Sequence, residues 1–146
     1  MKKKQIKILI AIVVIVIALG SVYAYTEFNR KATSTEDLKT EFNTSAAELI
    51  VEFEKDSKIS NTKYLNKTIE VSGNIKTIEN QTGFTIVLGD SANATSIRCS
   101  MDSSFVAGKN YTNGQAITIK GIYTGFNADE LGIGSDIIIN KSIIKP

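Results

Sequence analysis

The chain of 146 residues has no histidine and a single cysteine, Cys99. Without histidine, the chain can support neither Ser-His-Asp or Cys-His catalysis nor an ordinary zinc site. A lone cysteine cannot form an intramolecular disulfide, and its alternation in phase with Ile97 and Met101 predicts a small core residue. We therefore expect no enzymatic activity, no cofactor and no metal site.

The sequence also lacks the basic stripe that nucleic-acid-binding proteins usually carry. Residues 1–25 hold four lysines and no acidic residue, whereas residues 26–57 hold four basic and eight acidic residues. Residues 58–146 hold nine basic and seven acidic residues, so this part is close to neutral. This charge distribution argues against a nucleic-acid partner.

The longest apolar run, Ile8 to Leu19, lies in a stretch that has no charge between Lys7 and Glu27. As a helix, Ile6 to Tyr25 would be roughly 30 Å long, which is the thickness of the hydrocarbon core of a bilayer. Because lysines precede the run and acidic residues predominate after it, the N-terminus is expected in the cytoplasm and the rest outside. We predict a single-pass transmembrane helix in the cytoplasmic membrane.

A cleaved signal peptide is the alternative, because Val22-Tyr23-Ala24 resembles a small-residue cleavage site. The length of the apolar run and its content of Ile and Val favour retention as a signal anchor. No cysteine follows Leu19-Gly20-Ser21, so a lipid-modified N-terminal cysteine is excluded. Both outcomes export the domain, either anchored in the cell envelope or secreted after cleavage.

Residues 34–57 are predicted to form one amphipathic helix, which ends within residues 57–61. Ser34 and Asp37 have the spacing of a capping box at a helix start. Apolar residues then recur at helical spacing, and acidic residues occupy the other face. The apolar stripe predicts packing on the following domain, with a helix–helix dimer seam as the alternative. The stripe consists of Leu38, Phe42, Ala46, Leu49, Ile50 and Phe53.

From Thr68 onward the period of the apolar pattern changes to two, which predicts strands. Gly73 in the first strand is expected at a bulge or bend. Five strands with a long first strand fit a small closed barrel better than a sandwich of seven or more. The predicted strands are Thr68–Ile78, Phe84–Leu88, Ser96–Met101, Ala116–Tyr123 and Asp136–Ile144.

The residues around the first strand resemble a known family. Residues 47–50, followed by the Tyr, Lys and Gly within residues 63–75, are similar to the opening of the tRNA_anti-like OB-fold proteins. Residues 97–99 and 113–121 are similar to the third and fourth strands of that family. The resemblance implies an OB-fold over residues 47–145, and it implies no catalytic or binding residue.

The expected fold is mainly β, with a five-stranded OB-fold barrel preceded by an amphipathic α-helix and an N-terminal transmembrane helix. Residues 1–25 would hold the cytoplasmic lysines and the anchor, residues 26–57 the acidic linker and helix, and residues 58–146 the barrel. A composition rich in Lys, Ile and Asn is typical of a bacterial protein.

OB-folds usually bind ligands across their second and third strands, next to the loop that joins the fourth and fifth strands. Candidate ligand-binding residues are Thr85 and Arg98 on that face, and Tyr123 and Phe126 near the loop. The face holds one base and no aromatic side chain, so it lacks the stacking platform of single-strand binders. The residues expected to point outward are Thr85, Val87, Ser96, Arg98 and Ser100.

The sequence thus predicts a non-enzymatic, membrane-anchored binding module of the bacterial cell envelope. Its partner would be an envelope protein, a peptide or a glycan. A single-stranded nucleic-acid-binding OB domain is the alternative.

Overall fold

The computed structural model describes residues 3–28, 34–80, 83–103, 105, 111–128 and 134–145. The chain divides into two compact units, Met1–Thr33 and Ser34–Pro146. The first unit contains α1 (Lys3–Phe28), which is exposed from Ile12 onward. Within the described ranges, no helix is long and apolar enough to cross a membrane.

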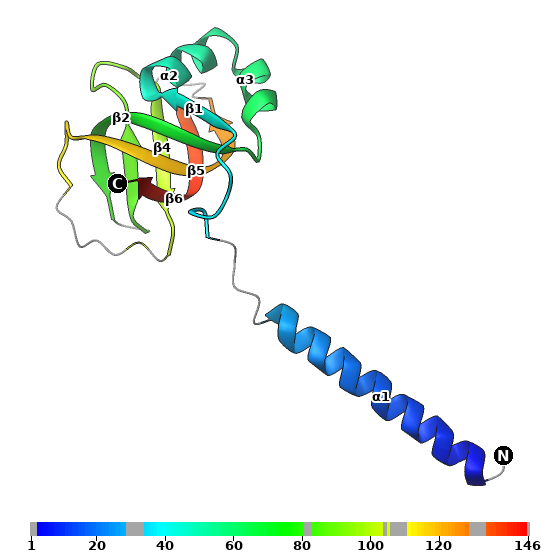
Figure 1. The fold of residues 1–146 in the computed structure, drawn as a ribbon. Helices are drawn as coiled ribbons and strands as arrows, with labels where there is room; N and C mark the ends of the chain where they lie inside the picture. The colour runs from blue at the N-terminus through cyan, green and yellow to red at the C-terminus, as the bar shows by residue number, and fades with distance from the viewer. Residues whose placement is uncertain are drawn as a thin grey trace. The chain divides into compact units, whose positions relative to one another are not determined.

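Five strands of the second unit close into a barrel (Figure 1). The order around the barrel is β2-β3-β4-β6-β5, and β5 returns to pair with β2. β4 and β6 are parallel, whereas the other neighbouring strands of the barrel are antiparallel. This arrangement confirms the predicted five-stranded barrel. The barrel strands are β2 (Thr68–Glu79), β3 (Thr85–Leu88), β4 (Ser96–Met101), β5 (Ala116–Asn127) and β6 (Asp136–Lys145).

A sixth strand, β1 (Phe42–Ser45), pairs in parallel with the first half of β2. It leads directly into α2 (Ala46–Lys55), which starts at a capping box. The Oγ of Ser45 accepts a hydrogen bond from the N–H of Glu48 at 3.2 Å, and the Glu48 carboxylate accepts one from the N–H of Ser45 at 3.0 Å. Together the two bonds satisfy two N–H groups that a helix start would otherwise leave unpaired.

The structure corrects the predicted start of this helix. Residues 34–38 form a turn, in which the N–H of Asp37 donates to the carbonyl of Ser34 at 3.1 Å. Phe42, which was predicted on the helical stripe, lies in β1 opposite Ile69. The prediction was wrong because pairing with a strand far along the chain overrides the local helical spacing.

The predicted helix is also shorter and is followed by a second one, α3 (Ser57–Tyr64). Asp56 separates the two helices, and its carboxylate accepts a hydrogen bond from the N–H of Ile59 at 2.9 Å. Asp56 thus acts as the N-cap of α3. The residues that were expected to end one helix therefore begin another.

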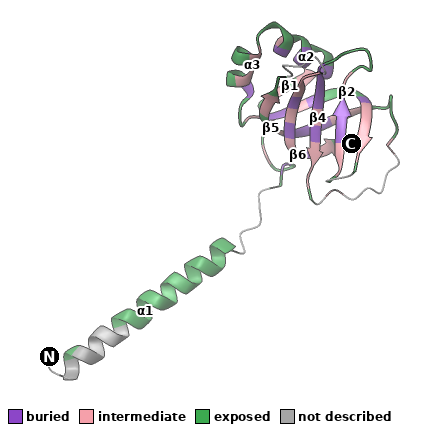
Figure 2. Cartoon of the chain, turned by 180° about the vertical axis from the view of Figure 1, so that it is seen from behind, coloured by how far each residue is buried: buried purple, intermediate pink, exposed green. Residues whose placement is uncertain are grey.

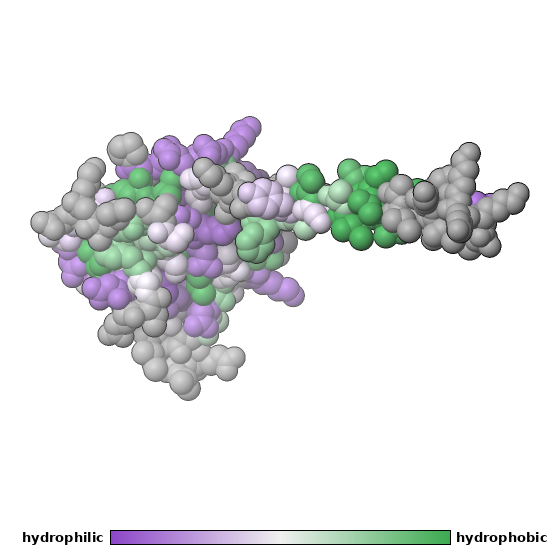
Figure 3. Space-filling model, turned by 90° about the horizontal axis from the view of Figure 1, so that it is seen from below, coloured by the Kyte–Doolittle hydropathy of each residue, from purple (hydrophilic) through white to green (hydrophobic). Residues whose placement is uncertain are grey.

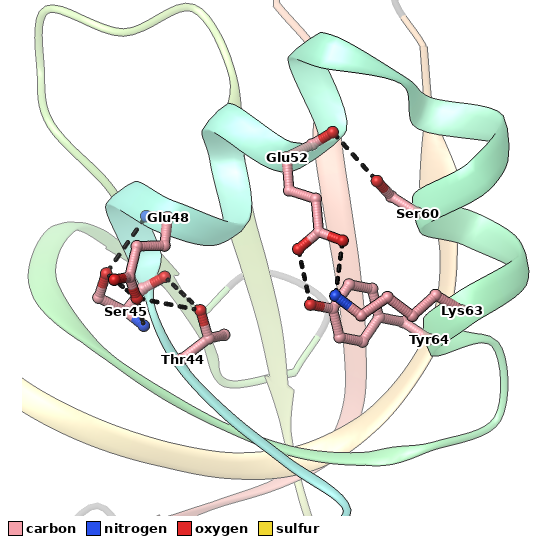
Figure 4. A network of polar contacts seen from close by, with 7 residues as sticks. All are labelled: Thr44, Ser45, Glu48, Glu52, Ser60, Lys63 and Tyr64. Atoms are coloured by element: carbon pink, nitrogen blue, oxygen red, sulfur yellow. Dashed lines mark hydrogen bonds and ion pairs between the residues drawn. The ribbon is translucent and has the colours of Figure 1, made fainter.

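Glu52 of α2 joins the two helices (Figure 4). Its backbone carbonyl accepts a hydrogen bond from the Oγ of Ser60 at 3.0 Å. Its carboxylate accepts hydrogen bonds from the Nζ of Lys63 at 2.7 Å and from the hydroxyl of Tyr64 at 2.8 Å. Burial raises the pKa of Glu52, but the hydrogen bonds from Lys63 and Tyr64 outweigh burial and lower the pKa below its ordinary value.

α2 and α3 lie together at one end of the barrel (Figure 1). Figure 2 shows buried residues along the strands, and most buried apolar residues of the strands and of α2 belong to one hydrophobic core. Phe53 of α2 is 1% exposed, and its ring centroid lies 6.1 Å from that of Tyr64 in α3. The same ring lies 5.5 Å from Tyr123 and 5.2 Å from Phe126, both in β5. The predicted packing of the helix stripe on the barrel is thus confirmed for Phe53.

Gly73, which was expected at a bulge or bend, does not lie at a bulge. It stands opposite Ile117 of β5 in regular register, and the register shift of β2 against β3 falls between Ile75 and Thr77. A Cβ added at Gly73 would lie 2.6 Å from the Cβ of Ala46, closer than real Cβ atoms approach. Glycine is required because α2 begins directly against this position.

A buried lysine fastens the segment that precedes β1 to the outer face of the barrel. Lys120 of β5 is 4% exposed, and its Nζ donates hydrogen bonds to the carbonyls of Glu36, at 3.0 Å, and Leu38. The hydroxyl of Thr40 donates to the carboxylate of Glu70 in β2 at 2.7 Å. Because the donor or the acceptor of each bond is charged, these bonds are stronger than neutral ones.

We predict that the fragment beginning at Ser34 folds alone and that Phe53→Ala destabilises it by about 3 to 5 kcal/mol. The loss follows from the cavity that removal of a fully buried ring leaves among Tyr64, Tyr123 and Phe126. Urea denaturation followed by circular dichroism measures the change. Val51→Ala is the control, because Val51 lies on the same helix and is 63% exposed. Equal effects of the two changes would mean that α2 does not pack on the barrel.

We predict that Gly73→Ala destabilises the fragment by about 1 to 3 kcal/mol, because the new methyl group must push α2 away from β2. Gly125→Ala in β5 is the control, since a Cβ there meets nothing within 4 Å. Denaturation midpoints of the two variants are compared. A stability of Gly73→Ala equal to that of Gly125→Ala would contradict the close contact with Ala46.

Candidate functional site

The inner side of β3 and β4 follows the predicted alternation. The four residues expected to point inward at the centre of these strands have no exposed surface, and the two at the strand ends are half-buried. The buried four are Ile86, Leu88, Ile97 and Cys99, and the half-buried two are Phe84 and Met101. The predicted core position of Cys99 is therefore confirmed.

Arg98 dominates the outer side of the two strands. Its Nη1 lies 2.6 Å from Oε2 of Glu79 in β2, and its Nε lies 3.4 Å from Oδ2 of Asp136 in β6. The hydrogen bond to Glu79 raises the pKa of Arg98, and the charge of Asp136 adds to the effect. Since β3 separates β4 from β2, the arginine side chain crosses β3, and the ion pairs span four neighbouring strands.

Two residues expected on the outer face are in fact buried. Val87 of β3 is 3% exposed, and Ser96 of β4 is 6% exposed. Val87 lies opposite Arg98, whose side chain passes over β3 on its way to β2. Ser96 is covered by Lys76, whose Nζ donates a hydrogen bond to the serine Oγ at 3.0 Å. Long charged side chains thus cover part of the face that the alternating pattern predicted to be exposed.

Thr85 completes the part of the face that the prediction located correctly. It is half-buried and stands opposite Ser100 of β4 and Glu79 of β2. Thr85 and Arg98 therefore lie on the same outer side of neighbouring strands. The described surface around them presents hydroxyl groups and a guanidinium that is already paired with two carboxylates.

Tyr123 and Phe126 lie elsewhere, in the core beneath α2. The predicted strand ended at Tyr123, but β5 continues to Asn127, so Phe126 belongs to the strand and not to the loop. Tyr123 has no exposed surface, and its hydroxyl donates to Oδ1 of Asn61 at 2.7 Å. Burial raises its pKa to about 12. Tyr123 therefore offers no surface to a ligand; Phe126 is half-buried against Phe53.

Part of the predicted loop between β5 and β6, residues 129–133, lies outside the described residues. In the described part of the chain, no three His, Cys, Asp or Glu side chains come together as a metal site would require. Complete burial raises the pKa of the Cys99 thiol, which disfavours the reactive thiolate.

Sequence reasoning missed the partners of Arg98. Glu79 and Asp136 are separated from it by 19 and 38 positions, and strand pairing brings all three together. The outward phase of each strand could have indicated that these side chains share a face. That the three side chains meet depends on the order of the strands around the barrel. The residue pattern of a single strand does not contain this order.

The antiparallel ladder of β2, β3 and β4, the parallel pairing of β4 with β6 and the closure of β5 on β2 define an OB-type barrel. The chain belongs to the tRNA_anti-like family, whose model matches residues 1–133. The comparison with curated proteins gave no match.

The barrel is also similar to a crystal structure from Klebsiella pneumoniae that is described as a "putative nucleic acid-binding lipoprotein". The TM-score is 0.51 and the sequence identity is 17%, over 70% of this chain and 91% of that chain. At this identity the similarity shows a shared fold and nothing further.

Proposed function

We propose that this protein is a non-enzymatic OB-type interaction module that its N-terminal segment holds at the outer side of the cytoplasmic membrane. The observation that carries the proposal is the pairing of Arg98 with Glu79 and Asp136 on the face where OB-folds usually bind. A phosphate group would have to displace two carboxylates to reach this guanidinium. The face is therefore suited to a partner that is not a polyanion.

The non-enzymatic part of the proposal rests on chemistry that the chain lacks. The sequence has no histidine, and its one cysteine is buried with a raised pKa. General acid–base and nucleophilic catalysis depend on exposed groups with pKa values suited to proton transfer. The described face offers hydroxyl groups and ion pairs, which are groups that bind and orient a partner.

The membrane part of the proposal rests on the N-terminal sequence. No charged residue lies between Lys7 and Glu27, and Figure 3 shows mainly apolar side chains in the middle of α1, on the side that faces the viewer. A helix that is apolar on all sides is stable where other apolar groups surround it. The structural neighbour is described as a lipoprotein, which is also consistent with a place in the envelope. In a lipoprotein the lipid is attached to a cysteine, and the single cysteine of this chain, Cys99, is buried. In this protein the apolar segment would therefore be the membrane anchor.

A single-stranded nucleic-acid-binding domain is the second candidate function. The description of the structural neighbour as nucleic acid-binding, together with the OB-type barrel, favours this candidate. Against it stand the paired state of Arg98 and the near-neutral charge of residues 58–146. The aromatic residue Tyr123, which was expected near the site, is buried and cannot stack on a base.

We predict that the protein binds no single-stranded DNA or RNA at physiological salt, as measured by fluorescence anisotropy with labelled oligonucleotides. We also expect Arg98→Ala to leave the fold intact, because partly exposed ion pairs contribute about 1 kcal/mol or less. Lys141→Ala on an exposed position is the matched control for loss of one positive charge. Salt-sensitive, submicromolar binding that Arg98→Ala abolishes and Lys141→Ala preserves would establish the second candidate instead.

We predict that a reporter active only outside the cytoplasm is active when it is fused after Pro146. The lysines before the apolar run and the acidic residues after it specify this orientation. The same fusion without residues 1–33 is the control and should be inactive. Mass spectrometry of the mature chain then distinguishes a retained anchor from a cleaved signal peptide. Activity of a cytoplasm-specific reporter at Pro146 would refute export.

A further inference from the structure

A groove outside the β3–β4 face runs along the beginning of α2. Its volume is about 650 Å³, and it lies between α2, the middle of β2, the loop from β3 to β4 and the turn at Asn113 and Gly114. Small-molecule sites have volumes of roughly 300 to 1,000 Å³. The groove is therefore large enough for a ligand of two or three small rings.

Hydrogen bonds of the protein fix the walls of this groove. The N–H of Gly114 donates to the carbonyl of Ile75 at 2.7 Å, which ties the turn to β2. The Nζ of Lys76 donates to the carbonyl of Asn93 at 2.8 Å and to the Oγ of Ser96 at 3.0 Å, which ties the loop to β2. Walls that are fixed before binding reduce the entropy that a ligand must overcome.

Three side chains at the rim of the groove, unlike the groups that fix its walls, are not engaged in hydrogen bonds with the described part of the protein. Asn74, Asn93 and Asn113 line the groove, and all three are exposed. Within the described residues their carboxamides make no hydrogen bond to the protein. Each carboxamide can both donate and accept. Lys76 and Asp90 are the charged residues of the lining, so its formal charge is zero.

These features argue against an anion and against a peptide strand. At the start of α2 the Glu48 carboxylate already accepts the N–H of Ser45, so a second anion would meet a negative charge. A peptide strand would need an open sheet edge, but β2 is paired with β1 up to Ser72, and Gly89 donates to the carbonyl of Asn74 at 3.1 Å. A neutral ligand with many hydroxyl groups is not repelled by the Glu48 carboxylate and does not need an open sheet edge.

We propose that this groove binds a neutral saccharide. The inference rests on the proposed function as an interaction module and adds the chemical class of the ligand. Hydroxyl groups of the sugar would bond to the three carboxamides at the rim. The small residues of the floor, Ala46, Ala47 and Gly73, leave room for the apolar face of a sugar ring against α2.

The test uses the full chain, labelled with nitrogen-15, in micelles of a phosphocholine detergent that carries no sugar. Chitotetraose, cellotetraose and maltotetraose are titrated to about 10 mM, roughly ten times a Kd of 1 mM that corresponds to weak binding. Amide shifts are followed by NMR. We expect saturable shifts around Ala47, Ser91 and Gly114 with at least one of the three saccharides.

Two variants locate the binding. Ala47→Trp fills the groove from an exposed position on α2 and should weaken binding at least tenfold, which is about 1.4 kcal/mol. Val51→Trp is the matched control, because Val51 is exposed on the same helix and does not line the groove. Asn113→Ala should also weaken binding, whereas Asn127→Ala at an exposed position outside the groove should not.

The outcomes separate this inference from the proposed function. Absence of shifts with all three saccharides, or binding that Ala47→Trp leaves unchanged, overturns the saccharide site and leaves the interaction module standing. Shifts around the groove with a peptide and with no saccharide also overturn it. Oligonucleotide binding that depends on Arg98 overturns the proposed function itself.

Discussion

The packing of Phe53 is the contact on which the rest of the domain depends. Its ring packs against Tyr64 of α3 and against Tyr123 and Phe126 of β5, so two consecutive helices and a strand much further along the chain meet at one side chain. The ring can occupy this place because Ser45 caps α2 and the first residue of the helix, Ala46, lies directly against Gly73. Helix start, glycine and ring therefore act together, and the two helices close an end of the barrel that would otherwise expose its core.

The closed end of the barrel also accounts for the position of two tyrosines, Tyr64 and Tyr123. Tyr64 and Tyr123 are buried, and their hydroxyls are bonded to Glu52 and Asn61. Aromatic side chains used in this way cannot form the stacking surface with which other OB-folds hold bases.

The barrel, its strands and most of its core could be predicted from the sequence, because a period of two and turn residues are local signals. The core positions of Ile86, Leu88, Ile97 and Cys99 followed from alternation alone. The start of α2, the strand β1, the partners of Arg98 and the burial of Val87 and Ser96 could not be predicted in this way.

Each of these errors has a cause that is distant in sequence. Phe42 forms a strand because Ile69 pairs with it. Val87 is buried because Arg98 reaches across it to Glu79, a partner that only the order of the strands defines.

The attachment of residues 34–41 by Lys120 has a mechanical consequence. A pull on the chain before Ser34 reaches the bonds from Lys120 to Glu36 and Leu38 before it reaches β1 or α2. These bonds end on backbone carbonyls, so the load passes to β5, which is paired along both edges. Lys120 therefore takes up a pulling force first, and α2, α3 and the hydrophobic core beneath them carry less of it.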